Sequence, residues 1–450
     1  VTGRGYDAYR TNIGYTNSTI FTPTGGGTSA QTQISPSQLP SMNLKPEMNY
    51  QKEVGAELHF FNNRLHTDVT LYRSNTKNQI MTINLPVEGG ASSRPINAGN
   101  FQNTGMEFSL SGTPVQTEDW KWSIGGNISF NRGKVISFYP GQNMVVLSND
   151  WNQGDLEVRA YTGGDFGVIV SGWGAEAYNG TNTANHGKRV IVADGSYDWK
   201  FKRAADAKEK YKYGSIEPKF IGGINSDVSW KSLSLSTALQ FRKGGYIYST
   251  TSQFGTNVGN LASTTKWRED GLPRVSNTVK DANGNFVSFN DGVAPDAVFA
   301  DGTILKASNP NNLTGADQNI GGMTYKEAYE KGIIKPWQVT KFYAQQGSWS
   351  RAVIDNASDN GLAGGIYELS YVAVRDITLS YVVPKSIISK AAIRGLSVYF
   401  SVQNPFYLYN SLPDNINPDG VFRSSNSFMV TEWGGSPYSR KFIFGLNVSL

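Results

Sequence analysis

The sequence has 450 residues but contains no cysteine and only three histidines. Without cysteine there can be no disulfide framework, no thiolate metal site and no cysteine nucleophile. The histidines, His59, His66 and His186, are too few and too scattered to predict a catalytic triad or a zinc site. We therefore expect no metal site.

Long hydrophobic runs are also missing. No segment approaches 18 consecutive apolar residues, which excludes a transmembrane helix. Charged residues make up 17% of the chain, and 41 basic against 36 acidic residues leave a net charge of +5. A charge so diluted, without a run of five basic residues, gives no reason to expect a nucleic-acid partner. The chain starts at Val1 without a charged-then-apolar leader, so we expect its N-terminus to be a cut or processed edge.

What the sequence does contain is a repeated alternation of apolar and small polar residues. In SLSLSTALQF, residues 232–241, every leucine and the phenylalanine fall on one parity, and every serine falls on the other. A β-strand directs successive side chains to opposite faces, so this segment has one apolar and one polar face. The same pattern predicts about ten strands, over roughly 5–16, 50–61, 64–76, 103–112, 119–131, 217–230, 232–243, 367–383, 393–404 and 438–450.

The eighth of these strands changes phase along its length. Val372 and Val374 share one parity, whereas Ile377 and Leu379 continue the apolar pattern on the other. One extra residue in the strand would reconcile the two halves. The sequence therefore predicts a β-bulge at about Arg375–Asp376.

The connections between the predicted strands alternate between short and long. Those after strands two, four, six and eight are short, and those after strands one, three, five, seven and nine are long, the longest running from about Gly244 to Gly365. A soluble β-sandwich has no reason to place every long loop at one end, whereas an outer-membrane barrel has short periplasmic turns and long extracellular loops. Trp120, Trp122 and Trp230 lie beside short turns, as an interfacial aromatic girdle requires.

We therefore predict an all-β fold, a transmembrane antiparallel β-barrel with long extracellular loops. Its apolar face meets lipid and its polar face lines a lumen, because backbone groups in a bilayer must all be paired within the sheet. On this assignment His59 and His66, which flank the Asn-Asn pair at 62–63, are hydrated lumen residues near the periplasmic rim.

Five segments resemble the SusC/RagA family of TonB-dependent outer-membrane transporters. They follow one another in the family's order and together span most of the chain, and the first and last are the most specific. The segments are LKPEMNYQKEVGAELHFFNNRLHTDVTLYRSNTKNQI (44–80), NAGNFQNTGMEFSL (97–110), VRDITLSYVVP (374–384), LSVYFSVQNPF (396–406) and PYSRKFIFGLNVSL (437–450).

This resemblance implies a barrel of roughly 22 strands around a plug, of which residues 1–450 would form the C-terminal part with about ten strands. The plug domain and the N-terminal strands would not be in this chain. The resemblance also implies two protein partners: a SusD-like lipoprotein over the extracellular mouth, and TonB, which would act through the N-terminal part.

The long loops carry the candidate substrate-binding residues. Aromatic rings stack on the apolar faces of sugars, and charged or amide groups hydrogen-bond to hydroxyl or peptide groups. The candidates are Trp151, Trp173, Trp267, Arg268, Asp270, Trp337, Trp349 and Arg351. The alternative for each tryptophan is that it packs the loops together or contacts a partner protein.

Three further motifs have local interpretations. NINPDG (415–420) opens like a calcium-binding loop, but the twelfth position is Asn426 instead of the bidentate glutamate, so we interpret it as a tight loop structured by Asn, Pro and Gly. DANGNF (281–286) predicts a hairpin turn. YKEAYEKGIIKPWQ (325–338) predicts a short helix that ends before Pro336.

Taken together, the sequence favours TonB-dependent import of a nutrient, in the first place an oligosaccharide, across the outer membrane of a Gram-negative, Bacteroidetes-like bacterium. Such a protein makes and breaks no bond, so we expect neither catalytic residues nor a cofactor. A peptide importer of the same family, a passive outer-membrane porin and a secreted glycan-binding β-sandwich are the alternatives.

Overall fold

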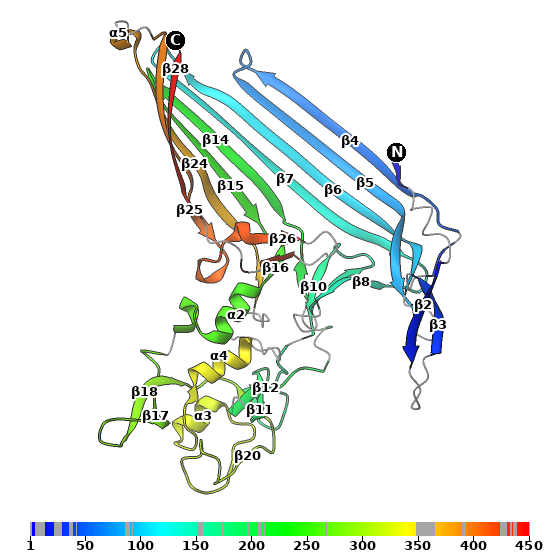
Figure 1. Ribbon diagram of the computed structural model, residues 1–450, viewed down its shortest axis with the longest axis vertical. Helices are drawn as coiled ribbons and strands as arrows, with labels where there is room; N and C mark the ends of the chain where they lie inside the picture. Colours follow the sequence, from blue (N-terminus) through cyan, green and yellow to red (C-terminus); the bar gives the residue numbers. More distant parts are fainter. Residues whose placement is uncertain are drawn as a thin grey trace. The chain divides into compact units, whose positions relative to one another are not determined.

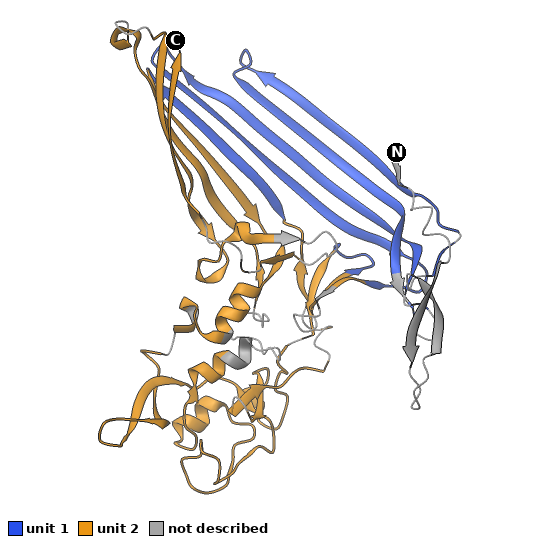
Figure 2. Ribbon diagram, viewed as in Figure 1, with its two compact units in different colours: residues 1–145, 160–166, 219–231 blue, residues 146–159, 167–218, 232–450 orange. Residues whose placement is uncertain are grey.

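The computed structural model consists mainly of long antiparallel strands, with smaller sheets and short helices in the connections (Figure 1). The chain divides into two compact units, shown in Figure 2: unit 1 holds residues 1–145, 160–166 and 219–231, and unit 2 holds residues 146–159, 167–218 and 232–450. The residues that the structure describes are 2–4, 14–21, 29–35, 39–41, 43–85, 91, 93–150, 156–172, 174–195, 198–205, 209, 212–265, 268–347, 365–388, 393–423, 430–432, 434 and 439–449.

Unit 1 is an antiparallel sheet in which strands β4, β5, β6, β7 and β14 follow one another in order. Their bounds are β4 (Glu47–Phe60), β5 (Leu65–Asn84), β6 (Ser93–Gln116), β7 (Trp120–Phe138) and β14 (Phe220–Trp230). The short β1 (Thr2–Arg4) pairs with β4, and β2 (Gly14–Phe21) and β3 (Ser29–Ser35) form a separate hairpin. The first predicted strand, 5–16, lies mostly outside the described residues, and the next four strands are confirmed.

The β4–β5 turn shows how the local sequence ends these strands. Phe61, Asn62 and Asn63 all have positive φ, at 54°, 55° and 63°. Asparagine adopts this left-handed conformation more readily than most residues, so the Asn-Asn pair allows the chain to reverse in four residues. The strands on either side therefore pair directly, from Phe60 opposite Leu65 onward.

The predicted long loop after the third strand, over 77–102, is wrong. Most of it is strand, because β5 continues to Asn84 and β6 starts at Ser93. The pairing passes an irregularity between Thr76 and Ile80, where Asn78 has a φ of 57°. The side-chain amide of Asn97 donates to the backbone oxygen of Asn78 at 2.7 Å and stabilises this break in the ladder. A segment rich in Asn and Gly thus remains in the sheet because side chains replace the lost backbone bonds.

Unit 2 contains the other four long strands, in the order β15, β24, β25 and β28. Their bounds are β15 (Leu233–Lys243), β24 (Tyr371–Val382), β25 (Gly395–Asn410) and β28 (Lys441–Ser449), and α5 (Lys385–Ile388) lies in the β24–β25 connection. The predicted β-bulge is confirmed: Ala238 pairs with Asp376 and Leu239 with Val374, so Arg375 is the extra residue.

The alternation predicted from the sequence sorts side chains into rows across the strands. Leu235, Leu379, Phe400 and Phe444 are successive partners across unit 2, and these residues are between 41% and 74% exposed. In unit 1, Val54 and Leu71 are partners with exposed fractions of 66% and 47%. A face with so many exposed large apolar side chains would be unfavourable in water, and contact with lipid accounts for it.

Three tryptophans occupy the apolar face beside the short turns of unit 1. Trp120 and Trp230 are direct partners with stacked rings, 5.8 Å between centroids, and the indole nitrogen of Trp122 donates to Ser226 at 3.0 Å. All three are at least one-third exposed. They form one aromatic patch at the strand ends, as the predicted interfacial girdle requires.

The long connections contain the remaining elements. These are β8 (Met144–Asp150), β9 (Leu156–Tyr161), β10 (Val168–Ser171), η4 (Thr183–Asn185), β11 (Val190–Asp194), β12 (Asp198–Phe201), β13 (Lys212–Ser215), β16 (Tyr246–Ser249), α2 (Thr250–Val258), η5 (Ala262–Thr265), β17 (Leu272–Lys280), β18 (Phe286–Val293), β19 (Val298–Phe299), β20 (Ile304–Leu305), β21 (Gln318–Asn319), α3 (Tyr325–Glu330), β22 (Trp337–Gln338), α4 (Val339–Gly347), β23 (Ile366–Glu368), η6 (Pro413–Asn415), η7 (Pro418–Gly420), β26 (Val421–Arg423) and β27 (Val430–Glu432). None of the described helices has the length and apolar character needed to span a membrane.

Two of the predicted local motifs are confirmed here. The predicted hairpin turn joins β17 to β18, and the carboxylate of Asp281 accepts hydrogen bonds from the backbone nitrogens of Asn283 and Asn285. The predicted helix is α3, which ends before Pro336. It begins with a capping box between Thr324 and Glu327, which satisfies two backbone donors of its first turn.

Part of unit 2 folds around a hydrophobic core of its own, which we call the loop core. It combines residues from the 167–218 and 244–347 stretches, and its largest members are Trp199, Phe201, Phe299, Tyr325, Trp337 and Phe342. The rings of Trp337 and Tyr325 are stacked with centroids 5.8 Å apart, and Phe342 meets Trp337 edge-on at 5.3 Å. These long loops are therefore a folded body rather than separate excursions.

Substitution of Leu235 by Arg should impair membrane insertion of the barrel, because a cation near the bilayer midplane on the lipid face costs about 2–4 kcal/mol. Ser234→Arg is the matched control, since it lies one residue away on the polar face. Heat-modifiable mobility on gels and yield in the outer-membrane fraction measure the effect. Equal damage from the two variants would contradict the assignment of the faces.

Substitution of Trp337 by Ala should destabilise the loop core by about 3–5 kcal/mol, the usual cost of removing a large buried aromatic side chain. Leu313→Ala, at a position that is 52% exposed, is the control and should change stability little. Hydrogen–deuterium exchange should become faster in residues 190–201 and 318–343 of the first variant only, with the long strands unaffected. Unchanged exchange there would show that Trp337 does not hold this body together.

Candidate functional site

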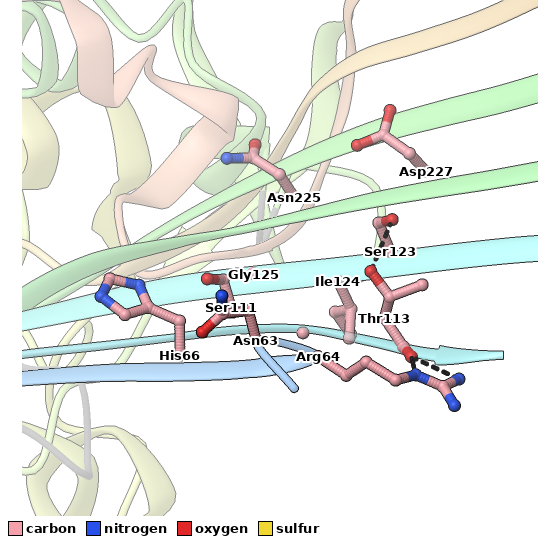
Figure 3. A pocket seen from close by; sticks show the side chains of 11 residues that line it. Asn63, Arg64, His66, Ser111, Thr113, Ser123, Ile124, Gly125, Asn225 and Asp227 are labelled. Atoms are coloured by element: carbon pink, nitrogen blue, oxygen red, sulfur yellow. Dashed lines mark hydrogen bonds between the residues drawn. The ribbon is translucent and has the colours of Figure 1, made fainter. Parts of the chain in front are cut away.

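The polar face of unit 1 has a hollow of about 350 Å³ near the short turns (Figure 3). Its lining residues are Asn63, Arg64, His66, Ser111, Gly112, Thr113, Ser123, Ile124, Gly125, Asn225 and Asp227. Arg64 donates to the backbone oxygen of Thr113 at 3.1 Å, and the hydroxyl oxygens of Thr113 and Ser123 are 3.3 Å apart. Hydroxyl, amide and carboxylate groups thus face one open space, where they can make weak, exchangeable hydrogen bonds to a hydrated polar molecule.

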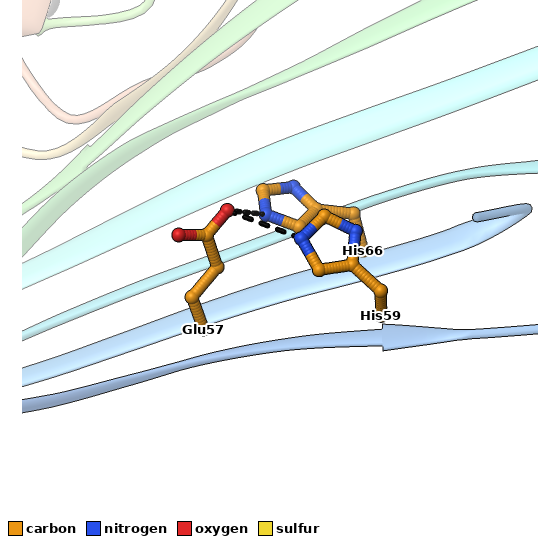
Figure 4. A group of neighbouring side chains, drawn as sticks. All are labelled: Glu57, His59 and His66. Carbon is orange, nitrogen blue, oxygen red and sulfur yellow. Dashed lines mark hydrogen bonds and ion pairs between the residues drawn. The ribbon is translucent and has the colours of Figure 1, made fainter.

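Beside this hollow, Glu57 and His59 of β4 meet His66 of β5 (Figure 4). The His59 and His66 rings are stacked with centroids 4.5 Å apart, and both Nε2 atoms lie within hydrogen-bond distance of the same Glu57 oxygen. The prediction that the histidines are scattered therefore holds for His186 and is wrong for the other two. His186 lies after η4, where its Nε2 is 2.8 Å from the backbone oxygen of Gly180.

The structure describes only three of the eight candidate substrate-binding residues. Those outside the described residues are Trp151, Trp173, Trp267, Trp349 and Arg351. Trp337 is 1% exposed and lies in the loop core. This agrees with the alternative that a loop tryptophan packs the loops together. Arg268 is half-buried and donates to the backbone oxygen of Gly259 at the end of α2, at 2.7 Å, whereas Asp270 is exposed. The binding role of the eight residues remains a prediction.

A second polar cluster, which the sequence did not reveal, fixes the 411–420 connection against the polar face of unit 2. The bulge residue Arg375 makes a bidentate ion pair with Asp419, in which Nη2 donates to Oδ1 at 2.6 Å. Its Nε donates to Gln240 at 2.7 Å, and its guanidinium lies 5.7 Å from the centroid of the Tyr407 ring. Tyr407 also donates to the Asp419 carboxylate at 2.8 Å.

This ion pair explains the calcium-like NINPDG motif. The side chain of Asn417 accepts from the backbone nitrogen of Asp419 at the start of η7, and the Asp419 carboxylate is engaged by Arg375 and Tyr407. The loop is thus structured by Asn, Pro and Gly, as predicted, and its Asp419 carboxylate pairs with Arg375. The signal available in the sequence was Arg375 itself, at the predicted bulge.

The same contacts set the protonation of Asp419. Partial burial opposes ionisation, but hydrogen bonds from Arg375 and Tyr407 and the charge of Arg375 outweigh it, so the pKa of Asp419 is lowered. A carboxyl group with a lowered pKa stabilises the fold above its unfolded-state pKa, and this stabilisation is lost as the pH falls through the folded-state pKa. The ion pair between Arg375 and Asp419 is therefore fully formed at neutral pH and weakens only in acid.

Comparison with known proteins finds similarity to TonB-dependent receptors. The family model described as TonB dependent receptor-like, beta-barrel matches residues 3–208. TonB-dependent receptor P3 of Formosa agariphila is 21% identical over 420 residues, which cover 90% of this chain and 34% of that relative. TonB-dependent receptor SusC of Bacteroides thetaiotaomicron is 22% identical over 324 residues, 66% of this chain and 29% of SusC.

Nearly the full length of this chain also matches part of a solved structure. A chain of the RagAB peptide importer in its closed-closed state superposes with a TM-score of 0.58 at 16% identity, covering 99% of this chain and 40% of that one. At this identity the likeness shows the fold. The chain spans about a third of the length of the curated relatives it matches. Family model, relatives and fold agree, and the chain is similar to the TonB-dependent receptor β-barrels of the SusC/RagA type.

Proposed function

We propose that this chain is the C-terminal barrel part of a TonB-dependent importer that carries a nutrient across the outer membrane of a Bacteroidetes-like bacterium. The observation that carries the proposal is the combination of an apolar, lipid-compatible outer face with a polar inner face on the same strands. The likeness to the TonB-dependent receptors adds the expectation of a plug and of TonB as the energy source, both acting through the rest of the protein. Because transport makes and breaks no bond, no catalytic residue is assigned.

The long loops support an extracellular capture function. They form a folded body with its own hydrophobic core and the capped helix α3, which a simple water-filled pore does not need. A folded body of this kind can hold binding groups in position. By family resemblance, a SusD-like lipoprotein would cover it, with cargo bound between the two proteins.

For the cargo we propose an oligosaccharide, with a peptide as the alternative. The loop stretches are rich in aromatic residues, which stack on sugar rings, but the same rings and the Arg and Asp residues beside them also suit peptides. The RagAB structure is named as a peptide importer, which keeps the peptide alternative open. Calorimetry can measure the binding of matched panels of oligosaccharides and peptides to the transporter purified with its SusD-like partner. The class of compound that binds distinguishes the two alternatives.

The proposed orientation places the Asn-Asn turn at 62–63 in the periplasm and the 244–365 connection outside the cell. The sequence contains no cysteine, so single-cysteine variants can be labelled cleanly within it. A membrane-impermeant thiol reagent should label Asn260→Cys in intact cells and should reach Asn62→Cys only after the outer membrane is opened. Both residues are exposed, so the difference reports sidedness. The opposite labelling pattern would overturn the orientation.

Energy coupling separates an importer from a passive porin. Deletion of TonB should abolish accumulation of cargo while leaving its binding to the purified protein unchanged, because binding needs no energy. Uptake of the cargo in the deletion strain with and without plasmid-borne TonB is the measurement. Uptake that continues without TonB would identify a passive pore, even with every strand placed as described.

A further inference from the structure

Two imidazoles and one carboxylate converge on the polar face of the β4–β5 hairpin (Figure 4). His59 and His66 are direct partners in the antiparallel register, and Glu57 precedes His59 by two residues on the same strand. Residues two apart on a strand and residues opposite one another share a face, so the three side chains point to the same side. The Glu57 Oε1 atom is 3.2 Å from Nε2 of His59 and 3.0 Å from Nε2 of His66.

We propose that Glu57, His59 and His66 bind a divalent transition-metal ion, for which Zn²⁺ fits best. One carboxylate oxygen and two imidazole nitrogens form a donor set that zinc uses in proteins, and one ligand position is left for water. Each imidazole binds as the neutral ring, with its Nε2 lone pair on the metal and its hydrogen on Nδ1. No electron transfer is involved.

The spacing of the donor atoms fits such an ion. Four ligands at zinc–ligand distances of about 2.0–2.1 Å in a tetrahedron lie roughly 3.3 Å from one another. The two Glu57–histidine distances are close to this value, and all three donor atoms lie within 4.8 Å of one another. Small rotations of the two imidazoles would therefore suffice to close the site around an ion.

Charge and access also favour a cation here. Asp68 stands directly opposite Glu57 in the ladder and adds a second carboxylate to the same face. With neutral imidazoles the group carries a negative charge that attracts a cation. The side chains of Glu57, His59 and His66 are 61%, 48% and 36% exposed on this sheet, so the strands themselves leave the donor atoms open to an ion.

The cluster is not needed to align the hairpin. Pairing runs without interruption from Met48 opposite Lys77 to Phe60 opposite Leu65, and the tight turn fixes this register. An exposed histidine–carboxylate pair adds little stability by itself. The donor types exclude a preference for Ca²⁺ or Mg²⁺, which select oxygen ligands, and favour Zn²⁺ because imidazole is among its usual ligands.

Zinc titration of the full-length transporter tests the site. The protein is purified in detergent without a polyhistidine tag, and Zn²⁺ binding is followed by calorimetry and by metal content after gel filtration. Loss of a second-shell partner already weakens metal sites by about 10- to 100-fold, so His59→Gln or His66→Gln should weaken zinc binding by more than about 100-fold. His186→Gln removes the third histidine of this sequence and should leave binding unchanged.

A second readout separates loss of ligands from loss of folding. Co²⁺ bound to the wild type should show the visible absorption of a tetrahedral ion, and this absorption should vanish in the His59→Gln/His66→Gln double variant. That variant should keep the heat-modifiable gel mobility of the folded barrel. The proposal is overturned if the wild type binds no zinc, or if the folded double variant binds Zn²⁺ as tightly as His186→Gln does.

Discussion

Hydrogen bonds between neighbouring antiparallel strands are the interaction on which the rest of this structure depends. In a bilayer no water is available to the backbone, so each strand must satisfy its N–H and C=O groups on its neighbours. Continuous pairing then forces the side chains to alternate between two faces. One face collects rows such as Leu235, Leu379 and Phe400, and the other collects serine, glycine, asparagine and the histidine pair.

Because the side-chain period is two, the register of each pair decides which groups meet. A slip by one residue would move every apolar side chain to the lumen. The bulge at Arg375 is an irregularity of this kind, and it removes a residue from the ladder between Val374 and Asp376. The guanidinium of Arg375 forms an ion pair with Asp419 and so holds the 411–420 connection against the strands of unit 2. A local irregularity of the ladder thus positions a loop.

The long strands and the bulge could be predicted from the sequence because alternation and phase are local properties of the chain. The loop core could not, since Trp199, Phe299 and Trp337 come together from segments that show no common periodicity. The β5–β6 extension was hidden for a different reason: side-chain hydrogen bonds such as that of Asn97 keep an Asn- and Gly-rich stretch in the sheet.

The histidine pair was within reach of sequence reasoning. His59 and His66 are equally spaced from the Asn62–Asn63 turn, so a tight hairpin must place them opposite one another. Glu57, two residues before His59, then shares their face. Of the candidate loop residues, only Trp337 has a packing role that the structure describes, because aromatic residues in folded loops serve cores as readily as ligands.

One face of these strands meets lipid while the other meets water. Spin labels placed singly along residues 233–241 of the protein in bilayers, with collision rates measured against oxygen and against a polar nickel complex, test it most directly. Labels at Leu233, Leu235, Leu239 and Phe241 should favour oxygen, and labels at Ser234, Ser236, Ala238 and Gln240 the nickel complex. Accessibility that does not alternate with a period of two, or that alternates in the opposite phase, would contradict this assignment of the two faces.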